Sequence, residues 1–271
     1  MRFGIGRMML AAALLAAPAV PLPAAETTTT GQPGATAAPA LRLDPAAVAL
    51  LKAMSDRLAA AHSMSFTAIA TYESPALITH QPLAYTTLSQ VTLQRPDKLR
   101  VITPGDGAPS AFYYDGKQMM AYAPDSGLVA IADAPPTIDA MLQQADRVAA
   151  LYFPFTDVIV ANPYQDVAGE IRLAYVIGRS HVVGDTETDM VGVVTDALQA
   201  QVWIGTADHL PRMIRATFFG EPGQFRHQVE FRDWQLDPTL APDLFWSAKA
   251  AAAKRIEFAN LDMNIPSVPG H

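Results

Sequence analysis

The chain has 271 residues, half of them apolar, which is enough for one large domain with a substantial core. The absence of cysteine excludes disulfides, thiol catalysis and a lipid anchor on cysteine. A formal net charge of −7 argues against nucleic acid as a partner and against purely electrostatic docking on anionic lipid.

Residues 1–25 predict a secretory signal peptide. Arg2 and Arg7 precede an apolar run over 8–20, and small residues follow where cleavage would occur. The run falls short of the roughly 20 residues that span a bilayer, so a permanent anchor is the weaker alternative. Residues 26–40, rich in Thr, Pro, Gly and Ala, predict a flexible linker. We therefore expect an exported, periplasmic protein.

A single domain is expected over 41–258, followed by a loose tail over 259–271. Asp44 and Pro45 are an N-cap and a first-turn proline, and they predict an amphipathic helix to about Ala61. Alternation of apolar and polar residues then predicts a meander of strands. These strands cover 66–72, 84–95, 98–103, 110–114, 117–123 and 128–132.

An apolar helix is predicted to interrupt the strands. After Pro135 and Pro136, apolar residues recur at helical spacing over 137–150 and mark one face of a helix. Strands then resume over 171–183, 188–195, 198–204, 210–219 and 224–234. About eleven strands and two helices indicate an α+β fold in which one face of the sheet meets water and the other is covered.

The sequence shows no motif for catalysis or metal binding. Gly-x-Ser-x-Gly, phosphate-loop and His-Glu-x-x-His patterns are missing, and the six histidines lack metal-ligand spacing. The acidic group Asp185, Glu187 and Asp189 lacks the glycine and final glutamate of a calcium loop, so a solvated hairpin tip is favoured. We expect no catalytic residue, no metal and no cofactor.

Two polar residues share the apolar face of their strands. Arg95 follows Val91 and Leu93 on that face, where a buried guanidinium group is costly unless it donates to carbonyl groups or to an acid such as Asp139. A side chain that reaches solvent from the end of the strand is the alternative. His227 is interpreted as a hydrogen-bonded core residue in preference to a ligand contact.

Two sets of residues carry a resemblance to known families. Arg95-Pro-Asp-Lys-Leu-Arg100, with Tyr114-Asp-Gly-Lys117 leading to Tyr122, resembles the RPxKxR … DGxxxxxY pattern of the periplasmic lipoprotein carriers LolA and LolB. The second half looks like an uncharacterised family of predicted periplasmic proteins in the same superfamily. That likeness rests on 178–184, Gln-Val-Trp-Ile at 201–204, Leu-Pro-Arg at 210–212, Asp233-Trp234 and Phe245.

The resemblance implies an unclosed antiparallel β half-barrel of about eleven strands, with helices covering its concave face over an apolar cavity. It also implies that Arg95 contacts the lid helices and gates the cavity. Combined with the apolar insertion, it predicts residues that bind the ligand. They are Phe66, Val91, Leu93, Tyr114, Met119, Tyr122, Ile138, Met141 and Leu142.

The sequence therefore predicts a soluble, monomeric periplasmic binding protein or carrier for a hydrophobic or acylated ligand. The expected partners are a hydrophobic small molecule, a lipid or an acylated protein, with transient contacts to the envelope, and not nucleic acid. One alternative is an interaction or sensor module with a filled core. A second is an enzyme that acts on lipid or envelope glycan.

Overall fold

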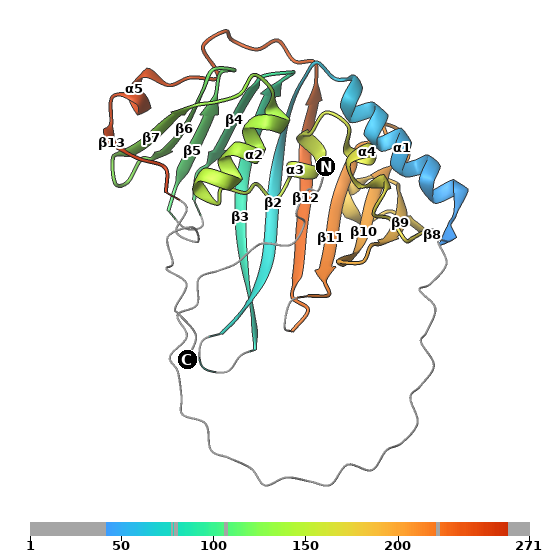
Figure 1. Ribbon diagram of the computed structural model, residues 1–271. Helices are drawn as coiled ribbons and strands as arrows, with labels where there is room; N and C mark the ends of the chain where they lie inside the picture. The colour runs from blue at the N-terminus through green and yellow to red at the C-terminus, as the bar shows by residue number, and fades with distance from the viewer. Residues whose placement is uncertain (1–41, 77, 79–80, 106–107, 221–222, 260–271) are drawn as a thin grey trace, which may run out of the picture.

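The computed structural model describes residues 42–259, except 77, 79–80, 106–107 and 221–222. The predicted signal peptide, the predicted linker and residues 260–271 of the predicted tail lie outside the described residues. Within them, thirteen strands form one sheet in the order β1-β8-β9-β10-β11-β12-β2-β3-β4-β5-β6-β7-β13 (Figure 1). In chain order the strands are β1 (Arg42–Leu43), β2 (Ser63–Pro75), β3 (Pro82–Gln94), β4 (Lys98–Thr103), β5 (Ser110–Tyr114), β6 (Gln118–Ala123), β7 (Leu128–Asp133), β8 (Leu173–Ser180), β9 (Thr188–Val194), β10 (Leu198–Gly205), β11 (Pro211–Phe218), β12 (Arg226–Leu236) and β13 (Lys254–Ile256).

The unclosed, mostly antiparallel half-barrel and the α+β class predicted from the sequence are confirmed. The eleven predicted strands correspond to β2 through β12, whose neighbours pair antiparallel. The two additional strands are short and parallel: β1 pairs with β8, and β13 pairs with β7. They cover the edges of the sheet, which would otherwise offer unpaired backbone groups. Strands of two or three residues, such as β1 and β13, are too short to show an alternation of apolar and polar residues, so the sequence did not predict them.

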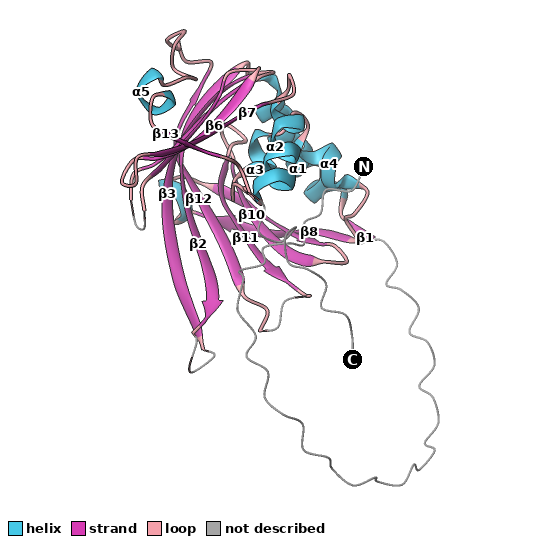
Figure 2. Ribbon diagram, turned by 60° about the vertical axis from the view of Figure 1, so that its left-hand side comes forward, coloured by secondary structure: helices cyan, strands magenta, loops and turns pink. Residues whose placement is uncertain are grey.

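Four helices cover one face of the sheet, which we call the concave face. They are α1 (Pro45–Ala60), α2 (Ile138–Ala149), α3 (Thr156–Ile159) and α4 (Pro163–Ala168). Figure 2 shows them gathered towards one end of the sheet, while α5 (Ala248–Ala251) lies on the opposite, outer face. We call α2, α3 and the segment between them the lid. None of the helices within the described ranges is long and apolar enough to cross a membrane.

The two predicted helices form where the sequence provides caps. The Asp44 carboxylate accepts a hydrogen bond from the Ala46 amide at 2.9 Å, and Pro45 occupies the first turn of α1. The Thr137 hydroxyl accepts from the Ala140 amide at the start of α2. Ala150 ends α2 in the left-handed region. The shorter α3, α4 and α5 were not predicted, since four to six residues give little helical periodicity.

The main core lies between the concave face and the helices. Phe66 of β2 is its centre, with ring contacts to Phe155 of the lid at 5.8 Å, to Phe231 at 5.8 Å and to Trp234 at 4.4 Å. These rings join the lid to two neighbouring strands, because β2 pairs with β12. Aromatic contacts of this kind fix the lid by shape as well as by buried area.

A second, smaller core lies on the outer face. Met120 of β6 and Val129 of β7 are fully buried there beneath Ala250 of α5. Tyr113, Tyr122, Ile131, Trp246, Ala251 and Ala253 pack around them. The chain after β12 thus crosses to the far edge of the sheet and covers an apolar area that the half-barrel leaves on its outer face.

Candidate functional site

Eight of the nine predicted ligand-binding residues meet in the core beneath the lid. Each is at most 6% exposed, and all belong to one apolar cluster. They are Phe66, Val91, Leu93, Tyr114, Met119, Ile138, Met141 and Leu142. In this closed arrangement their side chains are packed against one another. A ligand could enter between the lid and the sheet only if the lid moved.

Tyr122 is the ninth residue, and its expected position is wrong. Met119 and Tyr122 are three residues apart on β6, so they point to opposite faces of the sheet. Met119 joins the main core, whereas Tyr122 packs with Met120 and Trp246 in the outer cluster. The prediction assigned Tyr114, Met119 and Tyr122 to one site and did not separate the two faces of β6.

Arg95 stands at the end of β3 and reaches the lid. Its Nη1 donates to the Ile159 carbonyl oxygen at 3.0 Å, which is the kind of contact the resemblance implied. Its Nε and Nη2 atoms are buried without a hydrogen-bond partner among the described residues. Burial lowers the pKa of the Arg95 guanidinium group, and the nearby Asp139 carboxylate partly offsets this. The contact is present, while gating remains a proposal.

The start of the lid is held by further polar contacts. The Ile138 amide donates to the Pro96 carbonyl at 2.8 Å, and the Asp139 carboxylate accepts from the Ala161 amide at 3.1 Å. The Tyr114 hydroxyl donates to the Pro135 carbonyl oxygen. Desolvation, followed by the charges of Asp97 and Asp115, raises the pKa of Tyr114 to about 12, so the hydroxyl remains a donor at neutral pH. The contacts of Ile138 and Tyr114 fix one end of the lid to the sheet, and the contact of Asp139 ties the start of α2 to the chain that follows α3.

The concave face becomes exposed with distance from the lid. Along β3, exposure rises from 0% at Leu93 and 1% at Val91 to 47% at Tyr85 and 48% at Leu83. All four side chains point to the same face, because they alternate along one strand. In Figures 1 and 2 no helix crosses this end of the central strands. We call it the open end.

An aromatic row crosses four neighbouring strands at the open end. Tyr72 stacks on Tyr85 with ring centres 5.6 Å apart and on His227 at 6.5 Å, and Phe218 meets His227 edge-on at 5.0 Å. His227 therefore belongs to an aromatic row, in contrast to the closed core that was expected. One feature of the sequence indicated this row. The apolar alternation in β2 and β3 runs over more residues than one helix of the predicted length can cover.

The open end of the concave face carries no carboxylate, ammonium or guanidinium group on these four strands. Its side chains are Ser74, Tyr72, Leu83, Tyr85, Thr87, Ala216, Phe218, His227 and Val229. The charged residues of the same strands point outward. Glu73 forms an ion pair with Arg226 there, and Glu230 pairs with Arg232 at 2.7 Å. The strands are thus strongly amphipathic even where no helix covers them.

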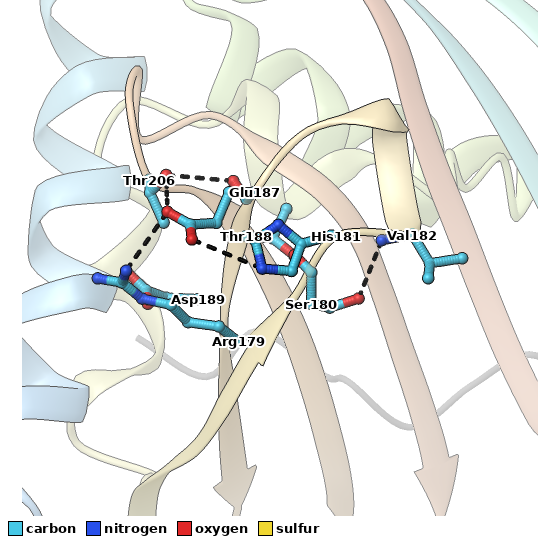
Figure 3. Close-up of polar contacts among 8 residues, drawn as sticks. All are labelled: Arg179, Ser180, His181, Val182, Glu187, Thr188, Asp189 and Thr206. Carbon is cyan, nitrogen blue, oxygen red and sulfur yellow. Dashed lines mark hydrogen bonds and ion pairs between the residues drawn. The ribbon is translucent and has the colours of Figure 1, made fainter.

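Glu187 and Asp189 of the acidic group near the β8–β9 hairpin belong to a surface network (Figure 3). Arg179 Nε donates to Asp189 at 3.0 Å, and its Nη1 lies 3.4 Å from Glu187. Glu187 also accepts from the Thr206 hydroxyl at 3.2 Å and lies 3.7 Å from the His181 ring. These carboxylates are engaged by protein donors. Among the described residues no group of three or more acidic, His or Cys side chains is arranged to hold a metal ion.

A family model described as predicted periplasmic protein (DUF2092) matches residues 47–259. The chain belongs to this family. The match confirms the likeness to an uncharacterised family of predicted periplasmic proteins, and the periplasmic localisation inferred from the sequence agrees with it. No curated protein matches the sequence.

Several solved structures are similar to this chain. The lipoprotein LppX of Mycobacterium tuberculosis has a TM-score of 0.48 and 13% identity, covering 73% of this chain and 98% of that one. The MucA/MucB complex of Pseudomonas aeruginosa has a TM-score of 0.44 and 14% identity, and the match covers 78% of this chain and 63% of that one. A LolA superfamily protein of Nitrosomonas europaea has a TM-score of 0.35 and 10% identity, and the match covers 74% of this chain and 97% of that one.

Proposed function

We propose that this protein is a carrier that binds one hydrophobic or acylated ligand on its concave face, with no bond made or broken. The observation that carries the proposal is the part of the concave face between Leu93 and Leu83 of β3, which holds no charged side chain and runs from the core beneath the lid to the partly exposed aromatic row. A contiguous apolar surface that remains exposed in the folded protein is typical of a binding site.

The energetics of acyl transfer suit this geometry. Moving a sixteen-carbon chain into water costs on the order of 12 kcal/mol, at about 0.8 kcal/mol per methylene, so a carrier needs a dry surface of comparable length. The open end supplies part of that surface immediately. Lifting the lid would add the surface around Phe66, Val91 and Leu93, which now lies in one buried cluster with Phe155, Met141 and Leu142 of the lid. In this proposal the eight core residues bind the buried part of the ligand and Arg95 acts on the lid.

A fluorescent long-chain fatty acid is the test probe. We expect micromolar or tighter binding by the wild-type protein and at least about tenfold weaker binding by Tyr85→Asp, which places a charge in the aromatic row. Ala84→Asp is the matched control, since Ala84 is the next residue on the same strand, is exposed, and points to the outer face. Met141→Trp should also weaken binding, because a larger side chain fills the space beneath the lid.

The filled lid interface favours one second function, an interaction or sensor module that carries no ligand. The same experiment separates the two. If the wild-type protein binds neither a fatty acid nor an uncharged fatty alcohol, and mass spectrometry of an organic extract finds no co-purified amphiphile, the carrier proposal fails and the interaction module replaces it.

A further inference from the structure

Two hairpin tips project side by side at the open end of the sheet. The β2–β3 hairpin and the β11–β12 hairpin are neighbours, because β12 pairs with β2, and the Arg226 amide donates to Glu73 at 3.1 Å where the two approach their tips. A depression of about 600 Å³ lies between them, lined in part by Pro75, Pro82 and Phe225. The strands that lead to both tips reach beyond the helices in Figure 1.

Apolar side chains are concentrated on this edge. Ile78 at the β2–β3 tip is 91% exposed and Phe219 at the β11–β12 tip is 43% exposed, and Leu83 and Tyr85 follow just inside the open end. Single exposed apolar residues are ordinary on protein surfaces. Four of the ten large apolar residues that are exposed within the described ranges lie at this one end, which is unusual for a surface that only meets water.

Among the described residues of this edge, a carboxylate and a guanidinium group pair with each other. Glu73 and Arg226 form an ion pair there, and the hydrogen bond from Arg226 is the main cause that lowers the pKa of Glu73. Because the whole chain is acidic, with a formal net charge of −7, attraction to anionic lipid does not explain an exposed apolar edge. Insertion of apolar side chains requires no such attraction.

We infer that this edge docks on a lipid bilayer. Ile78 and Phe219 insert among the lipid headgroups and acyl chains, and Tyr85 lies at the level where tyrosine prefers the interface. Two separate projecting tips suit a fluid surface, which adapts to each side chain, better than a rigid protein partner, which would need complementary pockets. Docking in this orientation places the open end of the concave face directly at the lipid surface.

Vesicle co-sedimentation tests the inference with the full mature chain. Vesicles of phosphatidylcholine and of phosphatidylcholine mixed with phosphatidylglycerol should both bind the wild-type protein, at low and at high salt. Ile78→Asp and Phe219→Asp should each lower the partition coefficient by at least about tenfold. Val182→Asp is the control: Val182 is 83% exposed, but it follows β8 at the opposite end of the sheet, so binding should not change.

Three results would overturn the inference: no binding of the wild-type protein to either vesicle, equal loss with Val182→Asp, or binding that requires phosphatidylglycerol and disappears at high salt. The docking edge and the ligand site can also fail separately. Ile78→Asp should leave binding of the soluble fatty-acid probe unchanged, while Tyr85→Asp should weaken it. Circular dichroism spectra of all variants should match the wild type, since the substituted side chains are exposed.

Discussion

Replacing Arg95 by leucine should close the lid more tightly. The guanidinium group makes one hydrogen bond to the lid, from Nη1 to the Ile159 carbonyl, and leaves Nε and Nη2 buried without partners among the described residues. A hydrogen bond from a charged donor contributes about 1.5–3 kcal/mol, and each buried donor without a partner costs about 1–3 kcal/mol. At the middle of these ranges, one bond contributes about 2 kcal/mol and two unpaired donors cost about 4 kcal/mol, so burying the guanidinium group costs the closed lid a net of about 1–2 kcal/mol.

Arg95→Leu removes both contributions and adds apolar contact with the core. We therefore expect lid opening to become roughly 5–30-fold rarer, the factor that corresponds to 1–2 kcal/mol. Hydrogen exchange measured by mass spectrometry should slow by that factor in peptides spanning 138–160 and remain unchanged in β8 to β10. Release of a bound fatty-acid probe should slow in parallel. Arg100→Leu, on the outer face of the next strand opposite Tyr113, should alter neither rate.

Faster exchange in the lid of Arg95→Leu would refute this reasoning. It would mean that the single hydrogen bond to Ile159 outweighs the two unpaired donors, and that Arg95 stabilises the closed lid. Unchanged exchange in the lid would mean that water solvates the guanidinium group and that Arg95 has no gating role.

Three further predictions concern stability, and urea denaturation checks each of them. Tyr114→Phe should lower the free energy of unfolding by about 1–2 kcal/mol, because the Pro135 carbonyl loses its donor, while Tyr113→Phe on the outer face should cost less. Phe66→Ala should cost about 3–5 kcal/mol, because it removes the ring that contacts Phe155, Phe231 and Trp234; a cost below that of Ile69→Ala on the outer face would contradict the assigned core. The lowered pKa of Glu73 means that its ion pair stabilises the fold above the ordinary carboxylate pKa and that this stability is lost as pH falls through the lowered value. Between about pH 5 and pH 3, Glu73→Gln should therefore lose less of its free energy of unfolding than the wild-type protein does. If the variant and the wild type lose stability equally over this range, the ion pair with Arg226 does not stabilise the folded state.

The sequence was most informative where a pattern extends over many residues. Strands of five or more residues alternate strongly enough to be located, and α2 has four buried residues at helical spacing. Short elements escape this test, as β1, β13 and α5 show, because tertiary contacts determine them. Ala250 becomes part of a core only because β6 and β7 present Met120 and Val129 on the outer face.

The candidate site was predicted in part for the same reason. Alternation places Phe66, Val91 and Leu93 on one face, and the structure brings them beneath the lid. Alternation does not reveal how far along the strands the helices cover the sheet. Tyr72 and Tyr85 continue the pattern of the core residues, and only the position of α2 and α3 determines that they form a partly exposed row. The packing of the lid was also beyond prediction, because it depends on how Phe153 and Phe155 fit against Phe112 and Phe66.

The position of the lid contacts bears on how the proposed carrier would work. The polar contacts of Ile138 and Tyr114 hold the lid at the end of the sheet remote from the hairpin tips. The rest of the lid is held mainly by apolar side chains, each of which contributes about 1.5–3 kcal/mol when fully buried. An acyl chain that entered from the open end would replace those contacts with equivalent ones, whereas water would not. The cost of burying Arg95 reduces the advantage of the closed lid, so the exchange needs less binding energy from the ligand. A lid fixed at the far end and released towards the docking edge would therefore open to lipid and remain closed to water.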